Sequence, residues 1–95
     1  MADQALLIAG LGNPGAQYAK NRHNAGFIVV DEIHAAHRFG PWKAKFDGLL
    51  SEGRLSGRKT WLLKPQTFMN DSGVSVGAAL RFFKLPLGAL VVIHD

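Results

Sequence analysis

The feature that most constrains the fold is a short, continuous apolar run near the start of the chain, Ala5-Leu6-Leu7-Ile8-Ala9, which ends in glycine. An uninterrupted apolar segment of this length is typical of a β-strand that is buried on both faces. Such strands occur in sheets that helices cover on each side, so the run predicts an α/β fold. A second run, Ala89–Ile93, has the same character. Neither run approaches the ~20 residues that a helix needs to cross a membrane.

The segments between these two runs supply helices and a hairpin. Apolar residues recur at helical spacing in two of them, and a polar turn separates two strand-like stretches that lie between the helices. The predicted elements are, in chain order, an amphipathic helix over Asn24–Arg38, strands over Ala44–Leu55 and Thr60–Lys64, and a helix that starts at Asp71 or Ser72 and that Pro86 ends. We find no internal repeat or linker, so residues 1–95 are predicted to form a single domain with a mixed sheet covered by helices.

Composition narrows the class of function. The 95 residues include 11 Lys and Arg against 7 Asp and Glu, which gives a formal charge of +4, and there is no cysteine. The lack of cysteine excludes a disulfide scaffold, thiolate zinc sites, iron–sulfur clusters and cysteine nucleophiles. An excess of cations on so short a chain favours a polyanionic partner, with nucleic acid first. The first residues, Met1-Ala2-Asp3-Gln4, lack the basic region of a secretory signal, which predicts a cytoplasmic protein.

The glycine-rich loop after the first strand, Gly10-Leu11-Gly12-Asn13-Pro14-Gly15, matches a dinucleotide-binding pattern. That kind of site needs a helix that begins inside the motif and an acidic residue at the end of the next strand. Here helical periodicity starts only at Asn24, and the acids at the required spacing, Asp31 and Glu32, fall inside the predicted helix. The pattern therefore disfavours a dinucleotide site. A plain turn and a catalytic loop remain as alternatives.

Polar residues close to this loop favour the catalytic alternative. Within twelve positions the chain places Asn13, Tyr18, Arg22, His23 and Asn24. Histidine is the natural general base near neutral pH, and asparagine can hold a carbonyl group through hydrogen bonds. A second polar loop contains Asn70, and Asp95 follows the last apolar run, where a carboxylate could orient an imidazole. A His–Asp pair without a Ser or Cys between them suggests activation of water rather than covalent catalysis.

Two further histidines, His34 and His37, stand at i, i+3 spacing in the first predicted helix. This spacing alone could hold a metal ion, but no third ligand and no H-E-x-x-H pattern accompanies it. We therefore predict that both side chains lie on the solvated face of the helix.

Taken together, these segments resemble the bacterial-type peptidyl-tRNA hydrolases. The resemblance rests on four motifs in order: the glycine loop with Tyr18, then Arg22–Gly26, then Lys64–Asn70 with Ser72-Gly73, and finally His94-Asp95. It implies the α/β fold of that family and hydrolysis of the ester that joins a peptide to the terminal ribose of tRNA. Members of the family continue beyond Asp95, so the resemblance is to their amino-terminal half and implies a domain truncated after the strand that ends near Ile93.

The resemblance also implies roles for individual residues. His23 matches the base that activates water, and Asp95 matches the carboxylate that orients it. Asn13 and Asn70 match residues that position the substrate and polarise its carbonyl. The other matches to substrate-binding residues are Tyr18, Asn24, Phe68 and Met69.

No metal or cofactor is implied, and the implied partner is peptidyl-tRNA, with no membrane. The family is typically monomeric, whereas this chain is expected to self-associate through the uncovered strand Ala89–Ile93. These 95 residues alone are expected to hydrolyse the substrate poorly or not at all. The alternative function is a non-catalytic RNA-binding module on the same fold.

Overall fold

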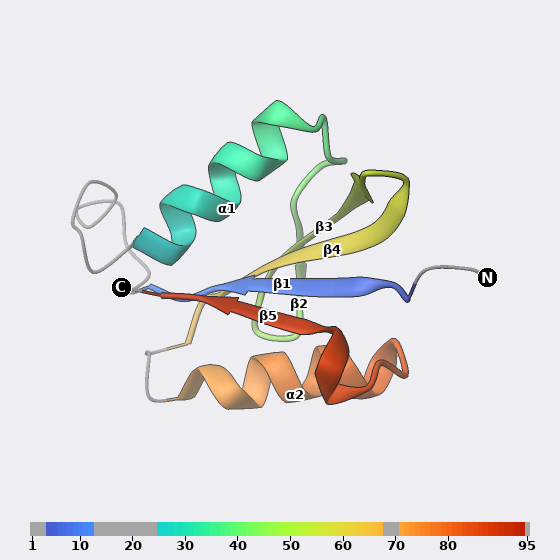
Figure 1. Ribbon diagram of the computed structural model, residues 1–95. Helices are drawn as coiled ribbons and strands as arrows, with labels where there is room; N and C mark the ends of the chain where they lie inside the picture. Colours follow the sequence, from blue (N-terminus) through green and yellow to red (C-terminus); the bar gives the residue numbers. More distant parts are fainter. Residues whose placement is uncertain (1–3, 13–24, 68–70, 95) are drawn as a thin grey trace.

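The computed structural model describes residues 4–12, 25–67 and 71–94. Within these residues the chain forms one five-stranded sheet with a helix on each face (Figure 1), which confirms the predicted α/β class. The elements are, in chain order, β1 (Leu6–Gly10), α1 (Ala25–Ala36), β2 (Lys43–Lys45), β3 (Gly48–Leu55), β4 (Arg58–Pro65), α2 (Ser72–Phe82), a 3-10 turn (Leu87–Ala89) and β5 (Leu90–Ile93). None of the described helices has the length and hydropathy that a membrane span needs.

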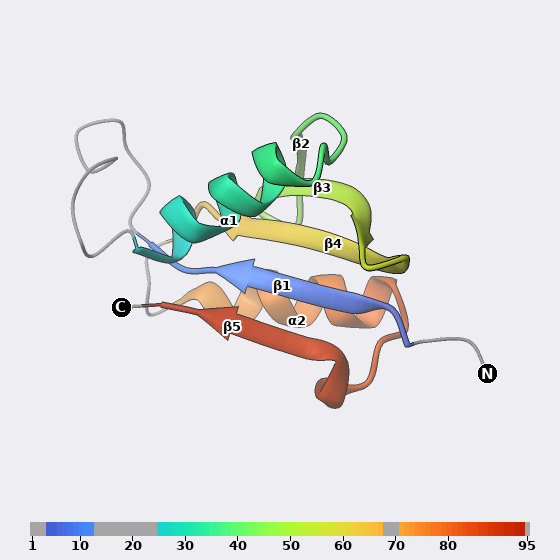
Figure 2. The ribbon, with the colours of Figure 1, turned by 45° about the horizontal axis from the view of Figure 1, so that its top comes forward.

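The sheet is mixed, with the strand order β2-β3-β4-β1-β5 (Figure 2). The interior strand β1 runs parallel to both of its neighbours, β4 and β5, while β2, β3 and β4 form an antiparallel meander. Because parallel strands point the same way, the carboxyl ends of β1, β4 and β5 lie at one edge of the sheet.

Two hydrophobic clusters hold the helices against the sheet. Alternate residues of a strand point to opposite faces, so neighbouring apolar residues in β1 and β4 belong to different clusters. The α2 side contains Leu7, Ala9, Trp61, Leu63, Val76 and Ala79, and the α1 side contains Ile8, Val30, Phe39 and Leu62. Leu7, Ile8 and Ala9 are all buried, as the first apolar run predicts.

The strand predicted over Ala44–Leu55 is wrong, because it is two strands. A turn at Phe46 and Asp47 separates β2 from β3, and both residues have positive φ, of 57° and 54°. This backbone suits a tight hairpin, and the Asp47-Gly48 pair is a turn signal in the sequence, although Phe is an unusual residue at a positive φ. The next turn is also tighter than predicted: Ser56 and Gly57 form it, and β4 already begins at Arg58.

The second helix ends at Phe82, four residues before the predicted stop at Pro86. Lys84 adopts a left-handed conformation with φ of 55°, and the N–H of Leu85 donates to the carbonyl of Leu80 at 2.9 Å. These are the features of a Schellman end, which satisfies the last carbonyls of a helix and reverses the chain. At the other end, Asp71 is the N-cap residue, but its side chain makes no capping hydrogen bond.

The last strand, β5, is an edge strand and is not buried on both faces as its apolar run predicts. Val91 and Val92 point to opposite faces, and their exposed fractions are 44% and 43%. Among the described residues only β1 pairs with this strand. An apolar run indicates that a strand can be buried on both faces. It does not indicate whether the described residues provide the side chains that would bury it.

Two buried serines give a matched test of stability. Ser51 donates from Oγ to the carbonyl of Gly40 at 2.6 Å, whereas Ser75 Oγ has no hydrogen-bond partner among the described residues. A buried hydroxyl costs about 1–3 kcal/mol when it is unpaired, whereas a typical intramolecular hydrogen bond contributes about 0.5–1.5 kcal/mol. We therefore expect Ser75→Ala to raise the free energy of unfolding by about 1 kcal/mol and Ser51→Ala to lower it by about as much, as measured by urea denaturation. Changes of the same sign in the two variants would contradict this assignment.

Candidate active site

The start of α1 and the ends of β1 and β5 lie together at the carboxyl edge of the parallel strands. In Figure 1 this is the end of the sheet at which β1 and β5 finish and both α1 and α2 begin. The N–H of Leu11, one residue after β1, donates to the carbonyl of Ile93 at the end of β5 at 2.8 Å. Open α/β sheets usually bind ligands outside the carboxyl ends of their strands, so this edge is the candidate site.

Two glycines set how closely α1 approaches this edge. A Cβ at Gly10 would overlap the carbonyl group of Gly26, and a Cβ at Gly26 would overlap backbone atoms of Leu11 and Ile93. The first turn of α1 therefore lies directly on the ends of two strands, at a separation that only glycine permits.

All three segments that carry the predicted site residues start or end at this edge. Residues 13–24 connect the end of β1 to the start of α1, residues 68–70 lie between β4 and α2, and residue 95 follows β5 and His94. The predicted residues themselves lie outside the described ones: Asn13, Tyr18, His23, Asn24, Phe68, Met69, Asn70 and Asp95. What the structure brings together is the set of described residues that flank these segments.

An ion pair that the sequence analysis missed joins two of these flanks. Lys64 in β4 donates from Nζ to Oδ1 of Asp31 in α1 at 2.7 Å, and the lysine side chain is only 14% exposed. Its ammonium also lies 4.4 Å from the centre of the Trp42 ring, a cation–π contact. The pair ties the helix after residues 13–24 to the strand before residues 68–70. No spacing rule links residues 33 positions apart, so the sequence held no signal for it.

The ion pair between Lys64 and Asp31 also bears on the two acids that were considered for a dinucleotide site. Asp31 and Glu32 both lie inside α1, as predicted, and Asp31 is engaged by Lys64. Neither carboxylate stands at the end of a strand, where the ribose of a dinucleotide would bind.

The prediction for His34 is wrong, because this ring does not lie on a solvated face. Its Nε2 is 2.7 Å from the carbonyl oxygen of Gly40, and the ring stacks on Trp42 with centroids 4.7 Å apart. The chain reverses after α1 and brings residues 39–42 back against the helix, which covers the imidazole. His37 is exposed, as predicted. In the described part of the chain, no group of three His, Cys, Asp or Glu side chains could hold a metal ion.

The fold and this edge define an α/β protein that carries its polar loops at the carboxyl ends of parallel strands. The family model for peptidyl-tRNA hydrolase matches residues 7–95, and the chain belongs to that family. It is 64% identical over 89 residues to a peptidyl-tRNA hydrolase of Ruegeria sp. and 61% identical over 90 residues to one of Mesorhizobium japonicum. These matches cover 94% and 95% of this chain but only 36% and 38% of the relatives.

Solved structures give the same result for the fold. A crystal structure of peptidyl-tRNA hydrolase from Acinetobacter baumannii superposes with a TM-score of 0.91 at 37% identity. The superposition covers all of this chain and 49% of the other. The chain therefore spans less than half the length of the relatives and structures that it matches.

Proposed function

We propose that this chain hydrolyses the ester bond between the peptide and the tRNA of peptidyl-tRNA, which releases tRNA for reuse. The observation that supports this best is the meeting of the flanks of all three polar segments at the carboxyl edge of the sheet. The identity to peptidyl-tRNA hydrolases over nearly the whole chain supports the same activity. The proposed class is a carboxylic ester hydrolase that uses no cofactor.

The proposed mechanism is general-base hydrolysis. His23 takes a proton from water, and the resulting hydroxide attacks the carbonyl carbon of the ester. Asp95 orients His23, while Asn13 and Asn70 donate hydrogen bonds to the carbonyl oxygen as negative charge develops on it. The bond between the carbonyl carbon and the ribose oxygen then breaks, and the protonated His23 returns its proton to that oxygen, so tRNA leaves with a free hydroxyl group. The peptide acid loses its own proton to water and leaves as a carboxylate. The remaining residues proposed to line the substrate site are Tyr18, Asn24, Phe68 and Met69.

The proposed partner is tRNA with its attached peptide, and the proposed location is the cytoplasm, where translation supplies this substrate. The charge of +4 supports a tRNA partner, because phosphate contacts supply much of the affinity for nucleic acid.

The test is hydrolysis of an N-acylated aminoacyl-tRNA, followed by the release of the labelled acyl-amino acid. We expect release that exceeds spontaneous hydrolysis in buffer and that stops when His23 is replaced by alanine. Binding of this substrate without any acceleration of its hydrolysis would contradict the proposal and favour the non-catalytic RNA-binding module.

A second prediction concerns the exposed edge strand β5 and its effect on self-association and on the rate of hydrolysis. β5 offers unpaired backbone groups together with exposed Val91 and Val92, which favours pairing with the same strand of another copy. We expect the 95-residue chain to form dimers in analytical ultracentrifugation and to have a lower kcat/KM than a version extended with the carboxyl-terminal part of the Ruegeria relative. If the 95-residue chain were a monomer with the same kcat/KM as the extended version, this prediction would be wrong.

A further inference from the structure

The strand register gathers basic side chains on one face of the β2–β3–β4 meander. Residues directly opposite each other on neighbouring strands point to the same face. Lys43 pairs with Leu50, Glu52 pairs with Trp61, and Arg54 pairs with Lys59. Leu50 and Trp61 belong to the cluster on the α2 side, so this is the face that carries the cations. We call it the basic face; its cations are Lys43, Lys45, Arg54 and Lys59.

A pocket of about 380 Å³ lies within the basic face. Lys43 and Lys45 line one part of it, and the rings of Trp61 and Phe83 line another. These two rings stack on each other with centroids 4.0 Å apart. Glu52 also lines the pocket, so its two lysines and one carboxylate leave a net charge of +1. An apolar lining strengthens the field of this excess charge, because water cannot screen it from the apolar side.

The single carboxylate of the basic face does not neutralise the two lysines of the pocket. Glu52 accepts a hydrogen bond from Nε1 of Trp61 at 3.2 Å and pairs with Nζ of Lys59 at 3.4 Å. Among the described residues, no carboxylate lies within ion-pair distance of Lys43 or Lys45. The ammonium of Lys45 instead lies 4.1 Å from the centre of the Phe82 ring. With Glu52 already paired, four cations and one carboxylate leave the basic face with a net charge of +3.

We infer that this pocket binds a backbone phosphate of RNA between Lys43 and Lys45. Small, exposed ammonium groups on flexible stems suit phosphate oxygens, and an apolar lining strengthens their attraction for an anion. The inference rests on the proposed function for the identity of the RNA, which is the tRNA part of the substrate.

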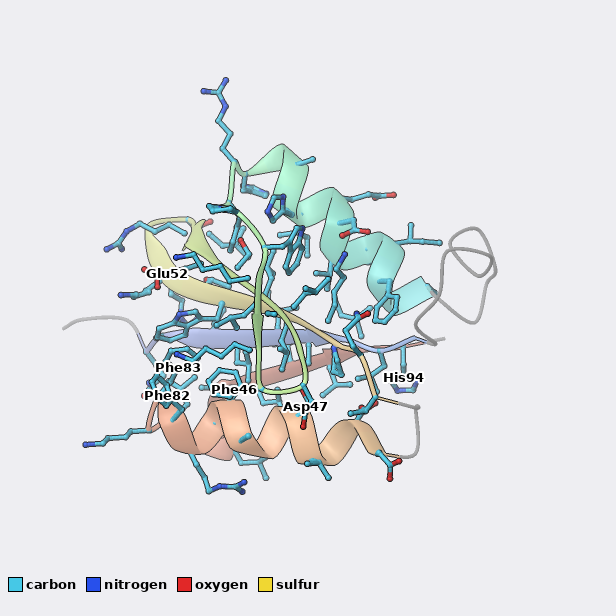
Figure 3. The ribbon with its side chains drawn as sticks, turned by 180° about the vertical axis from the view of Figure 1, so that it is seen from behind. Phe46, Asp47, Glu52, Phe82, Phe83 and His94 are labelled. Atoms are coloured by element: carbon cyan, nitrogen blue, oxygen red, sulfur yellow. The ribbon has the colours of Figure 1, made fainter. Side chains whose placement is uncertain are left out.

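Part of the pocket lies away from the candidate active site, as Figure 3 shows for Glu52 and Phe83 on one side and His94 on the other. Lys45 lies nearer to that site, because it pairs with Gly48, which pairs with Pro65 at the carboxyl edge. Trp61 lies four positions before Pro65, which is at the carboxyl edge, and this is about 13 Å along β4 at ~3.3 Å per residue. A tRNA whose acylated end binds at the edge extends much further than this, so one molecule can reach both places. The basic face would then hold the body of the tRNA while the edge holds its reactive end.

The experiment measures binding of deacylated tRNA by fluorescence anisotropy at 50 and 200 mM salt, with no ester present. The test variant combines Lys43→Gln with Lys45→Gln. The control variant combines Arg38→Gln with Arg81→Gln, which removes the same charge from exposed positions on α2 and after α1. We expect the test variant to raise Kd by at least about tenfold at 50 mM salt and to reduce the slope of log Kd against log salt by about 1 for each lysine. The control should change both values only slightly.

Thermal melts of both variants ensure that a loss of binding is not a loss of folding. Equal losses in the two variants would overturn the inference, because net charge alone would then explain the binding. Absence of tRNA binding by the unmodified chain at 50 mM salt would overturn it as well. The hydrolysis test of the proposed function is separate: if Lys43 and Lys45 prove necessary for binding but no ester is cleaved, the inference holds and the proposed activity fails.

Discussion

Replacing His23 with alanine is expected to lower kcat/KM for an N-acylated aminoacyl-tRNA by about 10²–10⁴-fold, which is the usual contribution of a general base. The expectation follows from the proposed role of this imidazole in taking a proton from the attacking water. Because the change removes a reacting group, it should leave the melting temperature nearly unchanged. The measurement is steady-state hydrolysis in the version extended with the carboxyl-terminal part of the Ruegeria relative.

His37→Ala is the matched control for this variant. His37 is exposed just after the end of α1 and carries the same ring, so a general effect of losing a histidine would appear in both variants. We expect His37→Ala to keep the parental kcat/KM. Parental activity in His23→Ala would remove this residue from the mechanism, whatever the control shows.

The order and type of the main elements could be predicted from the sequence because strong local patterns determine them. The apolar run before Gly10 corresponds to the interior strand β1, and the helical periodicity after Asn24 corresponds to α1 within two residues at each end. A continuous apolar run indicates burial on both faces of a strand, and helical periodicity indicates burial of one face of a helix. The folded chain buries β1 and one side of α1 in this way.

The errors in the bounds of the elements fall where the backbone takes a positive φ without glycine. Phe46 and Asp47 split the predicted long strand, and Arg38 and Lys84 reverse the chain after the two helices. A left-handed conformation costs Phe, Arg and Lys energy, so these side chains do not indicate it, whereas Asp before Gly is a turn signal. The surrounding packing stabilises it instead, as when the Phe46 ring meets the Phe83 ring at 5.7 Å.

The residue types and the order of the motifs allowed a candidate site to be predicted from the sequence. The contacts that support this site could not be predicted in the same way. The ion pair of Lys64 with Asp31 and the stacking of His34 on Trp42 both join positions that only the folded chain brings together. The basic face depends in the same way on where the β2–β3 turn falls. A turn shifted by one residue would send Lys43 and Lys45 to the opposite face of the sheet.

Gly26→Ala is expected to be the most destabilising of the single substitutions considered, with a loss of about 3 kcal/mol or more in the free energy of unfolding. Overpacking a core position costs typically ~1–3 kcal/mol when side chains can adjust. Here the new methyl group would meet backbone atoms of Leu11 and Ile93, which cannot rotate away. The helix must therefore move off the ends of β1 and β5, and a domain of this size should lose more than about 10 °C in melting temperature.

Gly73→Ala is the control, and it is expected to change the free energy of unfolding in the opposite direction. A Cβ at Gly73 meets no atom within 4 Å, and the residue lies in the first turn of α2, so alanine should stabilise the helix by up to about 1 kcal/mol. The two variants make the same chemical change in the first turn of a helix, and only the space around the new methyl group differs. If Gly26→Ala melted at or above the parental temperature, α1 could not rest on the strand ends as closely as the structure has it. The edge that supports the proposed activity would then need a different geometry, since the same contact sets where α1 begins relative to the ends of β1 and β5.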